Sequence, residues 1–435
     1  MKKVGILFLV LCLVFGTALA DGLTVRFFSI DRNDGILLEC DGETAFLDSG
    51  THDYGLKAVS QMRESGVEKL TYYVGTHAHK DHVGGGSAIL AAMHPSEVLQ
   101  PHDGVRRRIL SCAETKEERE AAEAAAYRTV YPGEEIPLGG ATMTVLGPLR
   151  LREPNKISDM ENNNSLVLRV VYGRRTFLLT ADAMPEEISE IAAVSGELFA
   201  CDVLKSPHHN GETGDELLKL ASPRYVVFST SDKAMPTKVA LSSVTAADAV
   251  PLITAEKQCG TVTVWTDGET LTVSVENEPE KIAFQKKELS LSAGKKKKLA
   301  AETKPAGYKA IHYVSDNPEI AEIDGQGAVH GRMPGETVVR AVLPGGRSAE
   351  CHVTVMPVSL SLNVGEITLN PGGTRQLRLK VQPSDLKTKV QWESDNSAVA
   401  KVGSTGVISA VSPGTATIRV KAPGGAEATC LVRVK

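Results

Sequence analysis

The chain has 435 residues, of which 42% are hydrophobic, so it can bury sizeable cores but is too long for one ordinary domain. Its formal net charge of −5 argues against a protein dedicated to binding nucleic acid through bulk electrostatics. This charge does not exclude nucleic acid as the substrate of an enzyme.

The first twenty residues have the pattern of a secretory signal peptide. Lys2 and Lys3 precede an apolar stretch over residues 4–15, and the small-x-small site 18–20 predicts a cut after Ala20. An uncleaved anchor helix is the alternative, but the stretch is short for a bilayer. No later segment approaches membrane-spanning length, so after cleavage we expect no transmembrane anchor and a secreted or cell-surface bacterial protein.

Residues 22–280 mix short strands with helices. The expected strands are 23–29, 35–39, 44–47, 70–76, 165–172, 176–180, 203–206 and 225–229. The expected helices are 54–65, 87–93, 115–127, 185–194 and 215–220. Hairpin-like pairs such as 166–180 interrupt a simple βαβ alternation, so the pattern predicts an α/β sandwich.

The densest group of metal-ligand side chains follows the strand expected at 70–76. Three imidazoles and a carboxylate lie within six residues: His77, His79, Asp81 and His82. Zinc, manganese and iron accept these ligands. A lone histidine is usually a surface or core residue, but four donors at this spacing favour a metal site with room for two ions.

Other predicted strand ends carry the same kinds of side chain. Asp48 and Asp182 each end a strand, and His208 and His209 follow another. A single aspartate after a strand is most often a turn residue. Together with the histidine run, these residues form one candidate set.

From about residue 289 the chain changes to short strands with Gly/Pro turns and contains an internal repeat of 78 to 79 residues. The motif Tyr-Val-Ser-Asp-Asn at Tyr313 recurs as Trp-Glu-Ser-Asp-Asn at Trp392, and Cys351 recurs as Cys430. About seven alternating strands per unit predict two tandem β-sandwiches. The equivalent cysteines are expected to face the two cores rather than to bond to each other.

These repeats resemble bacterial Ig-like domains of group 2, over residues 284–357 and 358–435. The resemblance implies spacer or adhesion roles, such as contacts with the cell surface or a polysaccharide, and no chemistry. The lysine run 295–298 is expected in a turn of the first module. It can contact an anionic wall polymer or nucleic acid, but a solvated turn is the favoured interpretation.

Residues 22–280 resemble the metallo-β-lactamase fold, an αββα sandwich, in the branch that includes the extracellular domain of the DNA-uptake competence protein ComEC. The motifs that carry the resemblance are the Asn-Asp-Gly-Ile-Leu-Leu segment at Asp34, Leu-Asp-Ser-Gly at Asp48, the histidine run, Asn-Asn-Asn-Ser-Leu-Val-Leu from Asn162, Leu-Leu-Thr-Ala-Asp at Asp182, and Leu-Lys-Ser-Pro-His-His-Asn-Gly at His208.

This resemblance implies two divalent metal ions, with zinc favoured and manganese as the alternative. The ligand positions carried over are His77 and His79 for the first ion, Asp81, His82 and His208 for the second, and Asp182 as the bridge. His208 is preferred to His209 because it comes first after the strand. Asp48 is expected to orient a metal-bound histidine through its other ring nitrogen.

Two departures from the family pattern concern the same site. Asn163 and its neighbours stand where most of the family has a further histidine, so the first ion has fewer nitrogen ligands. Ala181 replaces the usual glycine before Asp182, which is acceptable if that turn does not require a positive φ.

The implied chemistry is hydrolysis by a metal-activated hydroxide, with Asp81 and Asp182 as catalytic carboxylates. The first hypothesis is an exported hydrolase of a phosphodiester, either in nucleic acid or in a cell-wall polymer, and Lys80 and Lys205 either attract this anionic substrate or are solvated. The alternatives are a hydrolase of a lactone, ester or lactam, or a surface-binding protein in which the Ig-like modules carry the function.

Overall fold

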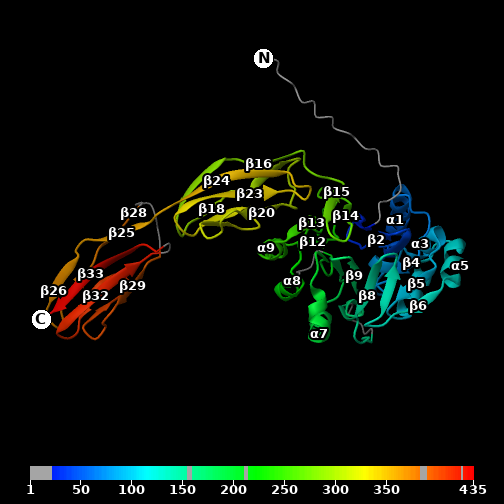
Figure 1. Cartoon of the computed structure of the whole chain (residues 1–435). Coiled ribbons are helices and arrows are strands. Elements are labelled where there is room, and N and C mark those ends of the chain that lie inside the picture. Colours follow the sequence, from blue (N-terminus) through cyan, green and yellow to red (C-terminus); the bar gives the residue numbers. More distant parts are fainter. Residues whose placement is uncertain (1–21, 154–158, 210–213, 383–388, 423–424) are drawn as a thin grey trace, which may run out of the picture.

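The computed structural model describes residues 22–153, 159–209, 214–382, 389–422 and 425–435. The signal peptide expected at residues 1–20 lies outside these ranges. A two-sheet sandwich is followed along the chain by two β modules, and the C-terminus lies at the end of the second module (Figure 1).

The first sheet of the sandwich has eight strands. They are β1 (Leu23–Phe27), β2 (Ile36–Cys40), β3 (Glu43–Leu47), β4 (Tyr72–Val74), β5 (Glu97–Gln100), β6 (Tyr127–Thr129), β14 (Val262–Thr266) and β15 (Leu271–Val275), in the spatial order β15-β14-β1-β2-β3-β4-β5-β6. The helices that follow these strands are α1 (His52–Glu64), α2 (Lys80–Val83), α3 (Gly86–Met93), α4 (Gly104–Cys112) and α5 (Lys116–Ala124).

Alternate side chains of this sheet pack on opposite faces, as the pleat of a strand requires. On β3, Ala45 and Leu47 belong to the core between the sheets, whereas Phe46 packs with Met62 of α1 and Ile89 of α3 in a second core. The sheet is therefore apolar on both faces, and helices cover its outer one.

The second sheet has seven strands. They are β7 (Glu135–Leu138), β8 (Ala141–Gly147), β9 (Val167–Tyr172), β10 (Arg175–Leu179), β11 (Val203–Lys205), β12 (Tyr225–Phe228) and β13 (Val250–Ile253), in the order β13-β12-β11-β10-β9-β8-β7. Its helical segments are α6 (Asp159–Asn162), α7 (Pro185–Ser195), η1 (Gly196–Phe199), α8 (Asp215–Ala221) and α9 (Lys238–Ala246). This layering confirms the expected α/β sandwich.

Several elements were not predicted. The expected helix 115–127 ends at Ala124, because Tyr127 begins the edge strand β6. Helix α9 has serine, threonine and valine at five of its nine positions, which are weak helix formers, and its packing against β13 overrides that propensity. The strands β5, β7, β8 and β13 to β15 also lacked a local signal strong enough to predict them.

The two Ig-like modules repeat one strand arrangement. The first contains β16 (Lys281–Phe284), β17 (Glu288–Ser292), β18 (Lys296–Lys298), β19 (Ala301–Lys304), β20 (His312–Ser315), β21 (Ala321–Ile323), β22 (Ala328–Gly331), β23 (Gly335–Val342) and β24 (Ser348–Met356). The second contains β25 (Ser359–Leu362), β26 (Glu366–Leu369), β27 (Thr374–Gln376), β28 (Leu379–Gln382), β29 (Gln391–Ser394), β30 (Ala400–Val402), β31 (Val407–Ala410), β32 (Gly414–Lys421) and β33 (Glu427–Val434).

Equivalent residues of the modules occupy equivalent places. Cys351 on β24 and Cys430 on β33 are both fully buried and both free, as the repeat predicted. The expected turn at residues 295–298 is wrong, because Lys296–Lys298 form strand β18 and pair with β22.

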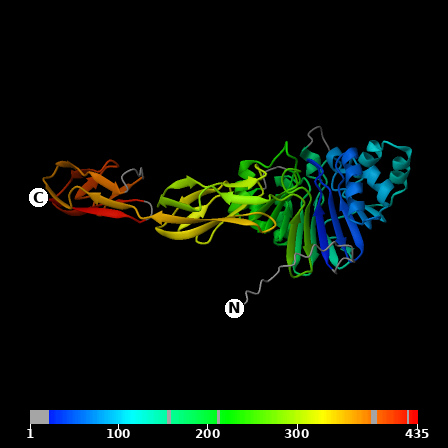
Figure 2. The same ribbon diagram turned by 90° about the horizontal axis from the view of Figure 1, so that it is seen from above.

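The first module packs directly on the sandwich (Figure 2). The sulfur of Cys259 lies 3.3 Å from the hydroxyl of Tyr308, and the side-chain amide of Gln258 donates to the carbonyl of Gly307 (3.2 Å) and accepts from the amide of Lys309 (2.6 Å). Buried apolar residues of the sandwich and of this module form one continuous core. Within the described ranges, no helix combines the length and apolar character needed to cross a membrane.

Helix α7 buries a carboxyl group against the second sheet. The Glu187 side chain is 1% exposed, and among the described residues neither carboxyl oxygen has a hydrogen-bond partner. Burial raises the pKa of Glu187 well above its usual range. At a pH above the pKa that the Glu187 carboxyl has in the unfolded chain, the folded state retains a proton that the unfolded state has released. The free energy of unfolding therefore falls as pH rises.

We expect Glu187→Gln to be more stable than the parent at pH 8 and equally stable near pH 4. The difference should grow by at most about 1.4 kcal/mol per pH unit. Urea unfolding across this pH range measures it, with the exposed Glu186→Gln on the same helix as the control. A gain that is the same at every pH would show that ionisation of Glu187 is not its cause.

Candidate metal centre

The candidate ligands converge because strand ends from both sheets meet at one edge of the sandwich. In the first sheet β3 and β4 are parallel, and in the second sheet β10 and β11 are parallel. Asp48, His77, Asp182 and His209 lie beyond the carboxyl ends of these four strands. Carboxyl ends of parallel strands point the same way, so side chains far apart in sequence share one location.

Four buried residues form the centre of this site. One ligand atom from each of Asp34, His82, Asp182 and His209 lies within 4.8 Å of the others. Oδ2 of Asp182 lies 3.2 Å from Nε2 of His82 and 3.6 Å from Nε2 of His209. Imidazole and carboxylate donors at this density match what zinc and related divalent ions accept.

The first two histidines of the run extend the group. Nε2 of His77 lies 3.1 Å from Nδ1 of His79, and the ring of His77 lies 4.1 Å from the ring of His82, centre to centre. Burial, together with the neighbouring His82, lowers the pKa of His77 well below its usual range. His77 is therefore held in the neutral form that binds metal ions.

The remaining expected ligands lie at the solvent side. Oδ2 of Asp81 is 4.0 Å from Nε2 of His209, and the Asp81 side chain is 52% exposed. Nε2 of His208 is 3.9 Å from Oδ2 of Asp182, and the His208 side chain is 37% exposed. The preference for His208 over His209 stays a prediction, and the structure brings the buried His209 closer to Asp182.

Asp48 lies behind His82. Its Oδ2 accepts a hydrogen bond from Nδ1 of His82 (2.7 Å), and the carboxylate also accepts from the backbone amide (2.9 Å) and the hydroxyl (2.7 Å) of Thr76. This arrangement turns Nε2 of His82 toward Asp182. Although burial lowers the pKa of His82, the carboxylates of Asp182 and Asp48 outweigh burial and raise it well above its usual range.

The asparagine run supports the loop that carries Asp182. Oδ1 of Asn163 accepts a hydrogen bond from the backbone amide of Met184 (3.2 Å). The hydroxyl of Ser165 accepts from the amide of Asp182 (3.3 Å) and lies 3.4 Å from Nδ1 of His77. The Asn163 side-chain amide thus positions the turn that follows Asp182, whose carboxylate is the central one of the site.

Asp34 and Lys205 form a buried ion pair that sequence reasoning missed. Nζ of Lys205 lies 2.6 Å from Oδ2 of Asp34 and donates to the carbonyl of Ala181 (3.0 Å), and Lys205 is 0% exposed. Both readings of Lys205, as a solvated residue and as an attractor of substrate, are therefore wrong. Asp34 was recognised only as part of a motif, and nothing local indicates that its Oδ1 lies 3.8 Å from Nδ1 of His209.

Left-handed backbone conformations gather at this site. The φ angles of Asp48, Ala181, His208 and His209 are 56°, 45°, 53° and 57°. Such conformations cost on the order of 1 kcal/mol or more in non-glycine residues and cluster where function demands them. From the sequence, alanine is expected to be acceptable at position 181 only if the turn does not require a positive φ. Ala181 does have a positive φ, so alanine is strained here where glycine would not be.

Unsatisfied atoms show that these residues fit a metal ion. In the described part of the chain, Oδ1 of Asp182 and both ring nitrogens of His209 are buried without a hydrogen-bond partner. Leaving such atoms unpaired costs roughly 1–3 kcal/mol each. A divalent ion would give the carboxylate and an imidazole nitrogen a partner at the same point.

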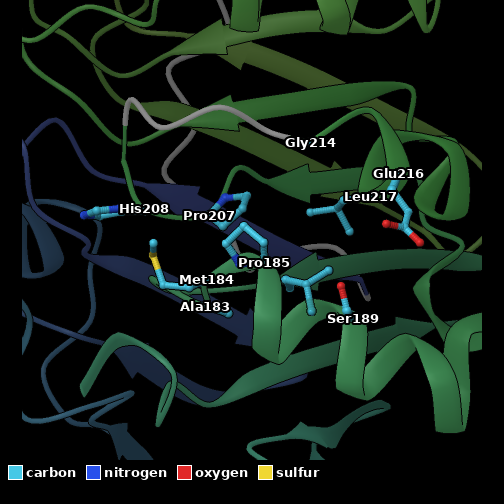
Figure 3. A pocket seen from close by; sticks show the side chains of 10 residues that line it. Ala183, Met184, Pro185, Ser189, Pro207, His208, Gly214, Glu216 and Leu217 are labelled. Carbon is cyan, nitrogen blue, oxygen red and sulfur yellow. The ribbon is translucent and has the colours of Figure 1, made fainter. Parts of the chain in front are cut away.

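A cavity of about 300 Å³ lies beside the metal group (Figure 3). Met184, Pro185 and Ile188 from the start of α7 line it, together with His208 and Leu217. His208 thus borders both the cavity and the central carboxylate. The lining is mainly apolar, so the cavity suits an apolar portion of a bound molecule.

Two comparisons with known proteins gave matches. Residues 278–353 and 352–432 each match the family model described as bacterial Ig-like domain (group 2), which confirms the resemblance seen in the repeat. No curated protein matches the chain.

Among solved structures, a motif mutant of the metallo-beta-lactamase from Cronobacter sakazakii (Enterobacter sakazakii) is 15% identical, with 42% of this chain and 73% of that chain covered and a TM-score of 0.28. Metallo-beta-lactamase SMB-1 is 16% identical, with 42% and 79% covered and a TM-score of 0.30. A mutant of the CmlA beta-hydroxylase is 13% identical, with 55% and 53% covered and a TM-score of 0.37.

Proposed function

We propose that the sandwich is a metal-dependent hydrolase. The observation that carries the proposal is the buried group of Asp34, His82, Asp182 and His209, whose ligand atoms lie within 4.8 Å of one another and include atoms of Asp182 and His209 without hydrogen-bond partners. We assign one metal ion to His82, Asp182 and His209, and we assign the other ion, the first of the two expected from the sequence, to His77 and His79. Zinc is the first choice because imidazole and carboxylate are its common ligands, and manganese is the alternative.

Each residue has a distinct task in this proposal. A bound divalent ion supplies a Lewis acid and lowers the pKa of a water molecule toward neutrality. Asp48 fixes the ring of His82, and the Ser165 hydroxyl fixes the backbone at Asp182. Asp81 is half-exposed beside His209, so its carboxylate is placed to orient an attacking water and to accept its proton.

For the substrate, the first candidate is a phosphodiester in nucleic acid or in a wall polymer. Its support is the order of the competence-type motifs along the sequence. Lys80 is the exposed cation next to the metal ligands, and it remains available to an anionic substrate after the structure has removed Lys205 from that role.

A second candidate is a carboxylic ester, lactone or lactam. The cavity beside His208 favours it, because an apolar lining accommodates an acyl or ring group better than a charged phosphodiester backbone. We place the protein outside the cytoplasm, as a secreted or cell-surface enzyme, in keeping with its Ig-like modules and the signal-peptide pattern.

Metal binding should stabilise the sandwich. We expect zinc at one hundred times its Kd to stabilise the EDTA-treated protein by about 2.7 kcal/mol, because an ion that binds only the folded state shifts the equilibrium by mass action. Thermal unfolding with and without zinc measures the shift, and metal analysis gives the stoichiometry. Asp182→Asn should lose the shift, whereas His94→Ala, an exposed histidine elsewhere, should keep it. Equal shifts in both variants would contradict the assignment.

Turnover tests distinguish the substrate classes. Bis-p-nitrophenyl phosphate and single-stranded DNA represent phosphodiesters, p-nitrophenyl butyrate and a lactone represent carboxylic esters, and nitrocefin represents lactams. Metal-dependent cleavage of one class that is lost in Asp182→Asn would support the proposal for that class. If the protein binds metal but turns over none of these compounds, the proposed substrate classes are wrong and the assignment of the metal site still holds.

A further inference from the structure

The first Ig-like module carries a concentration of positive charge that its fold does not explain. Between residues 281 and 309 there are nine lysines and two glutamates, although the whole chain is net negative. Four of the lysines are consecutive, and three of these form strand β18. All three, Lys296, Lys297 and Lys298, are exposed.

Two of these three lysines, Lys297 and Lys298, border a cavity of about 490 Å³ on the module. Lys286, Lys297 and Lys298 provide cationic walls, Gln285 and Glu302 provide polar groups, and the buried Leu299 provides an apolar base. The positive charges therefore surround a hollow rather than a featureless face.

The charge in the hollow is largely unneutralised. Lys296 forms an ion pair with Asp324 (2.8 Å), and Nζ of Lys297 donates to the carbonyl of Ser290 (2.9 Å). Among the described residues, no carboxylate forms an ion pair with Lys297 or with Lys298. These ammonium groups remain available to an anion.

The second module provides an internal comparison. Strand β27 (Thr374–Gln376) corresponds to β18, and it pairs with β31 as β18 pairs with β22. At the equivalent positions, 78 residues later, the second module has Val364, Thr374, Arg375 and Gln376 in place of Lys286, Lys296, Lys297 and Lys298. The same fold thus forms with one cation where the first module has four, so the structure of an Ig-like sandwich does not require them.

We infer that this lysine-bordered hollow binds a linear acidic polysaccharide. Lysines give point charges for sulfate, carboxylate or phosphate groups along the polymer, while Gln285 and Glu302 can bond sugar hydroxyls. None of the described residues that line the hollow is aromatic. Proteins that bind single-stranded nucleic acid generally stack bases on aromatic rings, so the lining favours a polysaccharide. The inference is independent of the proposed hydrolase activity.

The test uses the full chain with immobilised heparin as a sulfated polysaccharide. We expect salt-dependent binding that weakens at least about tenfold in the variant Lys286→Val/Lys298→Gln, which neutralises two lysines of the hollow, since exposed charges contribute additively and are screened by salt. The second module already has these residues at the same places, so the variant should fold, and an unchanged thermal transition checks this. The charge-preserving variant Lys286→Arg/Lys298→Arg should bind heparin like the parent.

Three results would overturn the inference. They are unchanged heparin affinity in Lys286→Val/Lys298→Gln, equal retention on neutral dextran, and tighter binding of a thymidine oligonucleotide than of heparin at the same salt concentration. As a matched control, Lys401→Gln removes an exposed lysine from the second module and should leave heparin affinity unchanged.

Discussion

His209→Ala will abolish tight metal binding, whereas His208→Ala will retain most of it. The two histidines are neighbours in sequence, but their surroundings differ. His209 is buried, both of its ring nitrogens lack hydrogen-bond partners in the described structure, and its Nε2 lies 3.6 Å from the central carboxylate of Asp182. His208 is partly exposed and borders the cavity.

The expected loss is large because even residues that only support metal ligands contribute tenfold to a hundredfold to affinity. For His209→Ala we expect at least about a hundredfold weaker zinc binding, and kcat/KM lower by roughly a thousandfold with any substrate that the protein turns over. His208→Ala should change KM more than metal content, because its ring lies between the cavity and the site.

Metal analysis after dialysis and competition with a zinc chelator measure the first quantity without an assay of turnover. His94→Ala serves as the surface control. If His208→Ala instead loses the metal while His209→Ala keeps it, the original sequence-based preference for His208 is right and the buried histidine is structural.

Lys205→Met will strongly destabilise the metal-free protein. The substitution removes the counter-charge of Asp34, a carboxylate that is itself fully buried. Although burial by itself raises the pKa of Asp34, the ammonium of Lys205, together with His209 and His82, outweighs burial and keeps that pKa below its usual value. Breaking one partner of a buried pair typically costs about 3–5 kcal/mol, because the other charge is left uncompensated.

We therefore expect urea unfolding in EDTA to show a loss of about 3–5 kcal/mol for Lys205→Met. Asp34→Asn/Lys205→Met should recover most of it, since no isolated charge remains. Lys219→Met, at an exposed position of α8, should stay within about 0.5 kcal/mol of the parent. A loss below about 1 kcal/mol for Lys205→Met would mean that Asp34 does not carry a buried charge.

Local sequence pattern was sufficient for the fold class, although it did not predict every strand of the two sheets. Strands such as β3 and β10 alternate or cluster apolar residues over a few positions, and a carboxylate follows each of them, Asp48 directly after β3 and Asp182 three residues after β10. The period of 78 to 79 residues likewise identified two similar β modules, and the positions of Cys351 and Cys430 in their cores followed from it. These regularities are short-range, because each depends on the residues within one strand or one repeat.

The histidine run was conspicuous for the same reason, since its donors are close in sequence. The identity of its distant partners depended on how the two sheets are placed. Asp34 precedes β2 and Lys205 ends β11, so their ion pair forms only when the first sheet faces the second. No periodicity in either segment encodes that distance.

The sequence by itself therefore determined a two-sheet sandwich, a set of candidate ligands and a tandem of Ig-like modules. Only the tertiary structure decided that Lys205 neutralises Asp34, that His209 is buried while His208 borders a cavity, and that lysines surround a hollow on one module. The physical reason is range. Hydrophobic periodicity and turn propensity act over a few residues, whereas burial, pairing of charges and convergence of ligands depend on packing between separate segments, some of which, such as those of Asp34 and Lys205, lie over a hundred residues apart.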